Sequence, residues 1–169
     1  NFPVQNNLDE RFYIPGLIQA ESYTSQSGLA TENTSDSGGG LNIGYTDIND
    51  YAEYPVFISQ SGVYDLNFRI AAQNQTGRIE LSLIENETSE VVGSFNLPTT
   101  GGWQSWATNT HEINLEAGVY TLKLRVAQAG FNLNWMEFLY SDNNLNTNTL
   151  ENTNPYISLY PNPFNNSLT

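Results

Sequence analysis

The chain has 169 residues, a length that suits one domain with a hydrophobic core plus short tails rather than two complete domains. It contains no cysteine, which excludes disulfides, a Cys-ligated metal and a thiol nucleophile. Eighteen acidic residues against five basic ones give a net charge of -13, and such a surface repels nucleic acid and anionic membranes. No apolar run approaches the roughly 20 residues of a membrane-spanning helix.

The first sixteen residues, NFPVQNNLDERFYIPG, are open to two interpretations. Residues 1–16 are either a linker or an N-terminal strand, because Phe12, Tyr13 and Ile14 could pack against a core. The pattern alone does not decide between them.

Residues 17–140 consist of short alternating segments separated by Gly, Asn and Ser, with no long stretch of helical period. Turn signals stand at SQSG before Val63, NQTG before Arg78 and EAG before Val119. The alternation in VYDLNFRIAA, RIELSLI and VYTLKLRVA predicts these inward-facing residues: Tyr64, Leu66, Phe68, Ile70, Ile79, Leu81, Leu83, Tyr120, Leu122 and Leu124. The pattern predicts an all-β chain, a β-sandwich of jelly-roll type with two antiparallel sheets.

Two tryptophans lie three residues apart in the polar segment TGGWQSWATNT, residues 100–110. Gly101 and Gly102 allow a sharp bend and have no side chains to cover the ring of Trp103. Trp106 starts the strand that follows, and we expect it to enter the core. The segment therefore predicts one exposed aromatic ring and one core anchor.

The acidic residues do not form a recognisable catalytic arrangement. Glycoside hydrolysis needs two carboxylates across a cleft, whereas the candidates are scattered over strands and turns: Asp47, Asp50, Glu53, Glu80 and Glu85. His111 is the single histidine, which excludes a multi-histidine metal site, and we expect it to be structural. No Gly-rich stretch precedes a helix as a phosphate site requires. We predict a chain without catalytic activity, with a small lyase or hydrolase on the same sandwich as the alternative.

Five stretches together resemble the family 6 carbohydrate-binding modules: IQAESYTSQSG, TENTSDSGGGLNIGYTDINDYAEYPV, TGGWQSWAT, LEAGVYTLKLRV and GFNLNWMEF. They occur in the family's order and cover about residues 17–140. The resemblance implies a β-sandwich that binds glycans without cleaving them, commonly attached to a glycoside hydrolase.

The resemblance also implies a sugar site in the loops at one edge of the sandwich. Tyr45 in NIGY and Trp103 in GGW would sandwich a terminal sugar, Asn132 in FNLN would donate to its hydroxyls and Glu32 in TEN would accept from them. Each residue also has an ordinary structural interpretation: Tyr45 could cap the sandwich, Trp103 could pack in the core, Glu32 could be solvated and Asn132 could stabilise a turn.

A second site, on a sheet face, is implied for some family members. In NDYAEYPVF, Tyr51 and Glu53 fall on one face of the strand and Ala52 and Tyr54 on the other. Several basic residues also lie on non-core positions, so a second site would include Tyr51, Glu53, Arg78 and Arg125. A tyrosine replaces the tryptophan often found there and Ser82 replaces an expected acid, and a solvated sheet face is the alternative.

The family resemblance further implies a structural calcium, far from the sugar and between the first and last strands. Glu21 in QAE and Asn134 in NLNW would be side-chain ligands, and Tyr23 and Leu41 would contribute backbone carbonyls. Calcium prefers roughly six to eight oxygen ligands. Without the resemblance, Glu21 reads as an ordinary acid at a strand end.

The whole motif set is most similar to modules that bind β-1,3-glucans such as laminarin. Agar-type galactan, xylan and cello-oligosaccharides are the alternative ligands. The implied partners are a polysaccharide or oligosaccharide and an attached catalytic domain in the parent chain, or a cell-surface glycan if the module serves adhesion.

The composition changes after Tyr140. Residues 141–155, SDNNLNTNTLENTNP, are predicted to be a flexible linker because they have little apolar content. Residues 156–169 contain LYPNPFNN, which resembles the start of the C-terminal sorting domain of type IX secretion. This resemblance implies a protein secreted, or displayed on the cell surface, by a Bacteroidetes-like bacterium.

Overall fold

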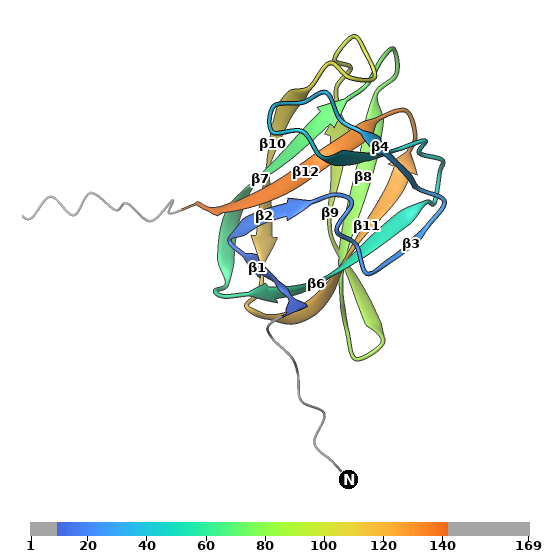
Figure 1. Cartoon of the computed structure of the whole chain (residues 1–169). Coiled ribbons are helices and arrows are strands. Elements are labelled where there is room, and N and C mark those ends of the chain that lie inside the picture. Colours follow the sequence, from blue (N-terminus) through green and yellow to red (C-terminus); the bar gives the residue numbers. More distant parts are fainter. Residues whose placement is uncertain (1–9, 142–169) are drawn as a thin grey trace, which may run out of the picture.

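The computed structural model describes residues 10–141. This part of the chain forms twelve strands and is drawn in Figure 1. The strands are β1 (Phe12–Ile14), β2 (Gly16–Gln19), β3 (Ser25–Ser27), β4 (Ala30–Asn33), β5 (Leu41–Gly44), β6 (Tyr51–Ile58), β7 (Gly62–Ala71), β8 (Gly77–Glu85), β9 (Thr88–Leu97), β10 (Ala107–Leu115), β11 (Gly118–Gln128) and β12 (Asn132–Tyr140).

The strands form two six-stranded sheets that face each other. Sheet A has the order β1-β6-β11-β8-β9, with β3 also paired to β6. Sheet B has the order β10-β7-β12-β5-β4, with β2 also paired to β12. The predicted all-β sandwich is confirmed, and within the described range a single pair, β1 with β6, is parallel. No helix in residues 10–141 is long and apolar enough to cross a membrane.

The core lies between the sheets and follows the predicted alternation. Tyr64, Leu66, Phe68 and Ile70 of β7 are completely buried, as are Ile79 and Leu81 of β8 and Leu122 and Leu124 of β11. Leu83 is 7% exposed and Tyr120 is partly buried against the core. Burial of these apolar side chains on both inner faces stabilises the sandwich.

The two ends of the described range complete the sandwich. Of the two interpretations of residues 1–16, the structure shows a strand for Phe12–Ile14: Ile14 is completely buried, and the Phe12 ring packs edge-on against Tyr54 with centroids 6.3 Å apart. At the other end, the backbone N–H of Ser141 donates to Val63 O. The predicted linker and sorting segment fall almost entirely outside the described residues.

Candidate functional site

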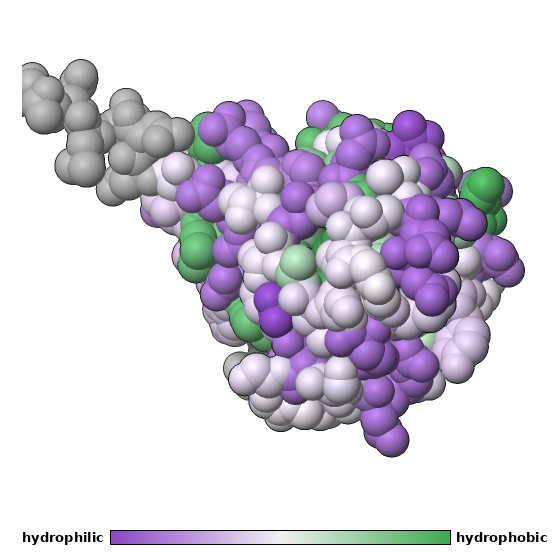
Figure 2. All heavy atoms as spheres, turned by 90° about the horizontal axis from the view of Figure 1, so that it is seen from above, coloured by the Kyte–Doolittle hydropathy of each residue, from purple (hydrophilic) through white to green (hydrophobic). Residues whose placement is uncertain are grey.

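The loops at one end of the sandwich enclose a pocket of about 580 Å³, within the size range of small-ligand sites. Figure 2 views this end of the molecule, whose surface is mainly hydrophilic. The loop pocket brings together all four residues of the implied sugar site, together with four that the sequence did not indicate. Its lining consists of Glu32, Tyr45, Thr46, Asp47, Trp103, Gly130, Phe131 and Asn132.

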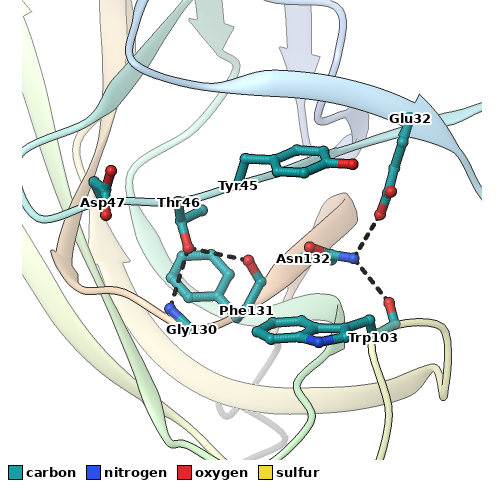
Figure 3. A pocket seen from close by; sticks show the side chains of 8 residues that line it. All are labelled: Glu32, Tyr45, Thr46, Asp47, Trp103, Gly130, Phe131 and Asn132. Atoms are coloured by element: carbon teal, nitrogen blue, oxygen red, sulfur yellow. Dashed lines mark hydrogen bonds between the residues drawn. The ribbon is translucent and has the colours of Figure 1, made fainter.

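Tyr45 and Trp103 face each other from opposite sides of the loop pocket (Figure 3). Tyr45 is 69% exposed and Trp103 is 45% exposed. Large aromatic side chains are usually well buried, so two exposed rings across one pocket are a notable departure from ordinary packing. The structure therefore places both rings where a flat ligand can stack between them, and neither packs in the core.

The backbone at Tyr45 is strained. Its φ is 56°, in the left-handed region, which typically costs on the order of 1–3 kcal/mol for a residue other than glycine. The next residue fixes this conformation, because the Thr46 hydroxyl donates to Phe131 O and accepts from the backbone N–H of Gly130, at 3.2 and 3.1 Å. These contacts hold the Tyr45 ring out of the core and over the pocket.

The chain bends sharply before Trp103, as Gly101 and Gly102 predict. Gly101 has a φ of 87°, in the left-handed region that favours glycine, and the space around it is open, with no other atom within 4 Å of a Cβ position. Thr100 anchors the turn, since its hydroxyl accepts from the backbone N–H of Ala72 at 2.8 Å. A rigid base thus supports an exposed tryptophan.

Glu32 is held by three amide side chains. Its Oε1 accepts hydrogen bonds from Asn132 at 2.8 Å, Gln104 at 3.1 Å and Asn42 at 3.3 Å. Asn132 Nδ2 also donates to Trp103 O at 2.8 Å. Both amide hydrogens of Asn132 are therefore used within the protein, which differs from the donor role toward a sugar that the resemblance implied for it (Figure 3).

The prediction that Trp106 enters the core is wrong. Trp106 precedes β10 and belongs neither to the buried core cluster nor to the partly buried residues packed against it. The indole is half-buried, and its Nε1 donates to Gln104 Oε1 at 3.2 Å. Trp106 therefore supports the residue that contacts Glu32, a role that strand alternation could not indicate.

A partly buried ion pair anchors the loop after β4. Arg69 donates to both carboxylate oxygens of Asp36, at 2.7 and 2.8 Å, and Asn134 Nδ2 donates to Asp36 at 2.9 Å. These hydrogen bonds, that of Arg69 foremost, lower the pKa of Asp36 to about 2. Next to it, the backbone N–H of Ser35 donates to Gln104 Oε1 at 2.8 Å. The ion pair therefore fixes a loop that contacts the wall of the pocket.

A family model described as carbohydrate binding module (family 6) matches residues 19–139. The chain belongs to this family. The alpha subunit of clotting factor G from Tachypleus tridentatus is 38% identical over 122 residues, which cover 72% of this chain and 18% of that protein. The chain spans less than a fifth of the length of the curated relatives that it matches.

Solved structures of family 6 modules superpose on this one. The module of Cellvibrio mixtus lichenase 5A, in complex with cellotriose, is 40% identical with a TM-score of 0.68, covering 75% of this chain and 98% of that one. A β-1,3-glucan-binding module from Bacillus halodurans is 33% identical with a TM-score of 0.70, covering 76% and 98%.

The module has a second hollow, of about 480 Å³, at the opposite end of β8. It lies between the β8–β9 hairpin and the β10–β11 turn, and includes Glu85, Glu90, Glu116 and one aromatic residue, Tyr120. Burial raises the pKa of Tyr120, and the three carboxylates raise it further. With a single ring this hollow offers no pair of facing aromatic surfaces, so the loop pocket is the candidate sugar site.

Three of the four residues of the implied second site are neighbours on the outer face of sheet A. Arg125 lies opposite Tyr51 and Lys123 opposite Glu53, while Arg78 is exposed on β8, beyond β11. Lys123 Nζ lies 3.8 Å from the centroid of the Tyr51 ring and 3.0 Å from Glu53 Oε1. The Lys123 ammonium thus covers one face of the Tyr51 ring, in a cation–π interaction.

Two of the residues implied as calcium ligands, Leu41 and Asn134, lie near Glu21. Glu21 Oε2 is buried without a hydrogen-bond partner, and Glu21 Oε1 lies 3.9 Å from the position of a Cβ on Gly40, next to Leu41. Ala20 N–H donates to Asn134 O at 2.9 Å, which brings Asn134 beside this turn. Within the described residues, no cluster of three acidic, His or Cys side chains surrounds the position.

Three of the five acids considered for catalysis have polar partners in the described part of the chain. Glu53 pairs with Lys123, Glu80 pairs with Arg125 at 2.9 Å, and Asp50 Oδ2 accepts from the backbone N–H of Asp47 at 2.7 Å. His111 packs against the rings of Phe68 and Phe95, with centroids 6.0 and 5.1 Å away. Burial lowers the pKa of His111. The packing of His111 fits the structural role expected for it.

Proposed function

We propose that this module binds polysaccharide without cleaving it, by gripping the end of a glycan chain in the loop pocket. The observation that carries the proposal is the pair of exposed rings, Tyr45 and Trp103, that face each other across the pocket (Figure 3). A pyranose ring has apolar C–H faces that can stack on both rings, while its hydroxyls extend sideways.

The polar wall of the pocket supports a chain-end site. Glu32 is fixed by three amides and keeps Oε2 free of them, so this oxygen can accept from a sugar hydroxyl. Asn132 then acts mainly by orienting Glu32 and Trp103. With the sugar stacked between two rings and one side closed by Glu32, the rest of the glycan leaves through the open side.

β-1,3-Glucan such as laminarin is the proposed ligand. The motifs around Glu32 and Trp103 support it, as does the similarity to the β-1,3-glucan-binding module of Bacillus halodurans. Cello-oligosaccharides are the first alternative, because the module of the Cellvibrio mixtus lichenase is in complex with cellotriose. Xylan and agar-type galactan are further alternatives.

The module is proposed to deliver an attached glycoside hydrolase to its polysaccharide. Two facts support a larger parent chain with a catalytic domain: the curated relatives are more than five times longer than the matched region, and the Cellvibrio mixtus module comes from a lichenase. An adhesion module that binds cell-surface glycan would use the same pocket with a different parent chain.

Affinity electrophoresis with laminarin, xylan, agarose and a soluble cellulose derivative tests the ligand. We expect retardation by laminarin that is lost in Trp103→Ala. A reducing-end assay on the same glycans tests the absence of catalysis. Release of reducing ends that a single carboxylate substitution abolishes would overturn the binding-module proposal.

A structural calcium at Glu21 is part of the proposal. A buried carboxylate oxygen without a partner is costly unless a cation compensates it, and Glu21 Oε2 is such an oxygen. Glu21 and Asn134 side chains with the carbonyls of Tyr23 and Leu41 are oxygen donors of the kind that calcium prefers. The bound ion would neutralise Glu21 and join the turn after β2 to β12.

Secretion by a type IX route is proposed from residues 156–169, which lie outside the described range. It rests on the segment LYPNPFNN. Fractionation of the producing cells, with antibody detection of the parent protein, tests the proposed location; retention in the cytoplasm would contradict it.

A further inference from the structure

Hydrogen-bond donors and acceptors are unequally divided around the loop pocket. The side-chain amides of Asn42, Gln104 and Asn132 direct their hydrogens to Glu32 and to other protein oxygens. The Thr46 hydroxyl donates to Phe131 O. These groups therefore have little donor capacity left for a ligand.

Two of the acceptors left for a ligand are negatively charged. Glu32 and Asp47 stand on opposite sides of the slot between the two rings (Figure 3). In residues 10–141 no hydrogen bond reaches Glu32 Oε2, and the exposed carboxylate of Asp47 has none either. Both carboxylates are therefore free to accept from a bound sugar.

Among the described residues that line the pocket, no Lys, Arg or His balances these carboxylates. Arg69, on sheet B, is already paired with Asp36, and Arg125, on sheet A, with Glu80. The chain as a whole is also acidic, with a net charge of -13.

We infer that Glu32 and Asp47 make the loop pocket selective for ligand charge. It accepts a chain end whose sugar is uncharged, binds an end with an ammonium group more tightly, and excludes an end with a carboxylate or sulfate. This inference rests on the proposed function, since it concerns the same pocket. The aromatic rings stack on a pyranose of any charge, so the flanking carboxylates decide the discrimination.

The physical reason is that a hydroxyl or ammonium hydrogen can be donated to Glu32 and Asp47, whereas an anionic group cannot. An ammonium adds a charge-assisted hydrogen bond. An anionic group would lose its water beside two like charges, with few donors to compensate. At separations of a few Å, each carboxylate is expected to change affinity by about tenfold.

The test uses three matched forms of laminaritriose and of cellotriose that differ only at C6 of the chain-end sugar. This carbon carries the natural hydroxyl, an amino group (6-amino-6-deoxy) or a carboxylate formed by oxidation. Titration calorimetry measures each affinity for the native chain, Asp47→Asn and Glu32→Gln. Glu112→Gln is the control, because it removes one negative charge from an exposed position on β10, outside the pocket.

We expect the oxidised form to bind at least about tenfold more weakly than the neutral form, and the amino form more tightly. The ratio of the affinity for the neutral form to that for the oxidised form should shrink in Asp47→Asn and Glu32→Gln but not in Glu112→Gln. It should also shrink as the salt concentration rises from about 0.02 to 0.5 M. Equal binding of neutral and oxidised forms, or equal changes in all three variants, would overturn the charge inference alone. If neither neutral trisaccharide binds, the proposed function fails, and this inference fails with it.

Discussion

Asn132 Nδ2 donates a hydrogen bond of 2.8 Å to Glu32 Oε1 although one hundred residues separate the two in the chain. The bond joins the start of β12 to β4 and defines one wall of the loop pocket. Gln104 and Asn42 reach the same oxygen from two other segments. The orientation of Glu32 therefore depends on four segments that meet only in the folded module.

Gln104→Met tests whether this orientation matters for binding. The substitution keeps the length of the side chain but removes its hydrogen bonds with Glu32, Asn42, Trp106 and the backbone N–H of Ser35. We therefore expect about fivefold to tenfold weaker laminaritriose binding. Titration calorimetry measures the loss in the native background and in Glu32→Gln. If Gln104 acts through Glu32, its effect shrinks in the second background, whereas additive effects would contradict this role. Gln60→Met, at an exposed turn, is the control.

Trp103→Ala and Trp106→Ala should separate stacking from support. Trp103 is 45% exposed, so its removal should weaken glycan binding at least about tenfold with little change in melting temperature. Trp106 is half-buried and donates a hydrogen bond to Gln104, so its removal should lower both stability and affinity. The stability loss should be smaller than for a core truncation, and the affinity loss smaller than for removal of Trp103. Thermal melts beside titrations check both. Unfolding by Trp103→Ala would place that ring in the core and contradict the pocket.

Asp36→Asn should reduce stability in a way that depends on pH. Because Arg69 lowers the folded-state pKa of Asp36 to about 2, from 3.8, the ionised carboxylate stabilises the fold above about pH 4. This contribution, on the order of 2 kcal/mol, disappears as the pH falls from about 4 to 2. Urea unfolding at pH 7, 4 and 2.5 should therefore show a difference between native chain and variant that closes at low pH. A difference that stays constant over this range would contradict the role of the ion pair.

Chelation tests the proposed calcium. An ion bound only by the folded state adds about 2.7 kcal/mol when its concentration is 100 times Kd, so EDTA should lower the melting temperature. Glu21→Gln should lower it by a similar amount in calcium buffer and should remove the sensitivity to EDTA. Elemental analysis of the purified chain measures the ion directly. An EDTA response that survives Glu21→Gln would exclude this carboxylate as a ligand.

Tyr51→Ala tests the outer face of sheet A. Lys123 covers a face of the Tyr51 ring and also pairs with Glu53, so we expect the substitution to weaken binding to long laminarin and to laminaritriose equally little. A Lys123→Ala variant uncovers the ring and serves as the comparison. Preferential loss of affinity for the long polymer in Tyr51→Ala would instead support a second glycan site on this face.

The local pattern of the sequence determined much of this fold. Alternation in a strand assigns side chains to two faces without knowledge of the partners, which is why the inner residues of β7, β8 and β11 were predicted correctly. Gly101 and Gly102 likewise indicated an exposed Trp103, because backbone freedom and the lack of a covering side chain are local properties. The motif set indicated the family, and with it the four residues that meet in the loop pocket.

Only the tertiary structure decided the partners of these residues. Trp106 lies just outside β10, where alternation no longer fixes the direction of a side chain toward or away from the core. The sequence did not indicate that Asp47 lines the pocket, that Gln104 bonds Glu32 or that Lys123 covers Tyr51. These contacts depend on the paths of separate loops and on strand register. Hydrogen bonds and charge contacts act over a few Å in space, whereas the sequence records only separation along the chain, so the polar wall of the pocket could be described only once the two sheets had brought those segments together.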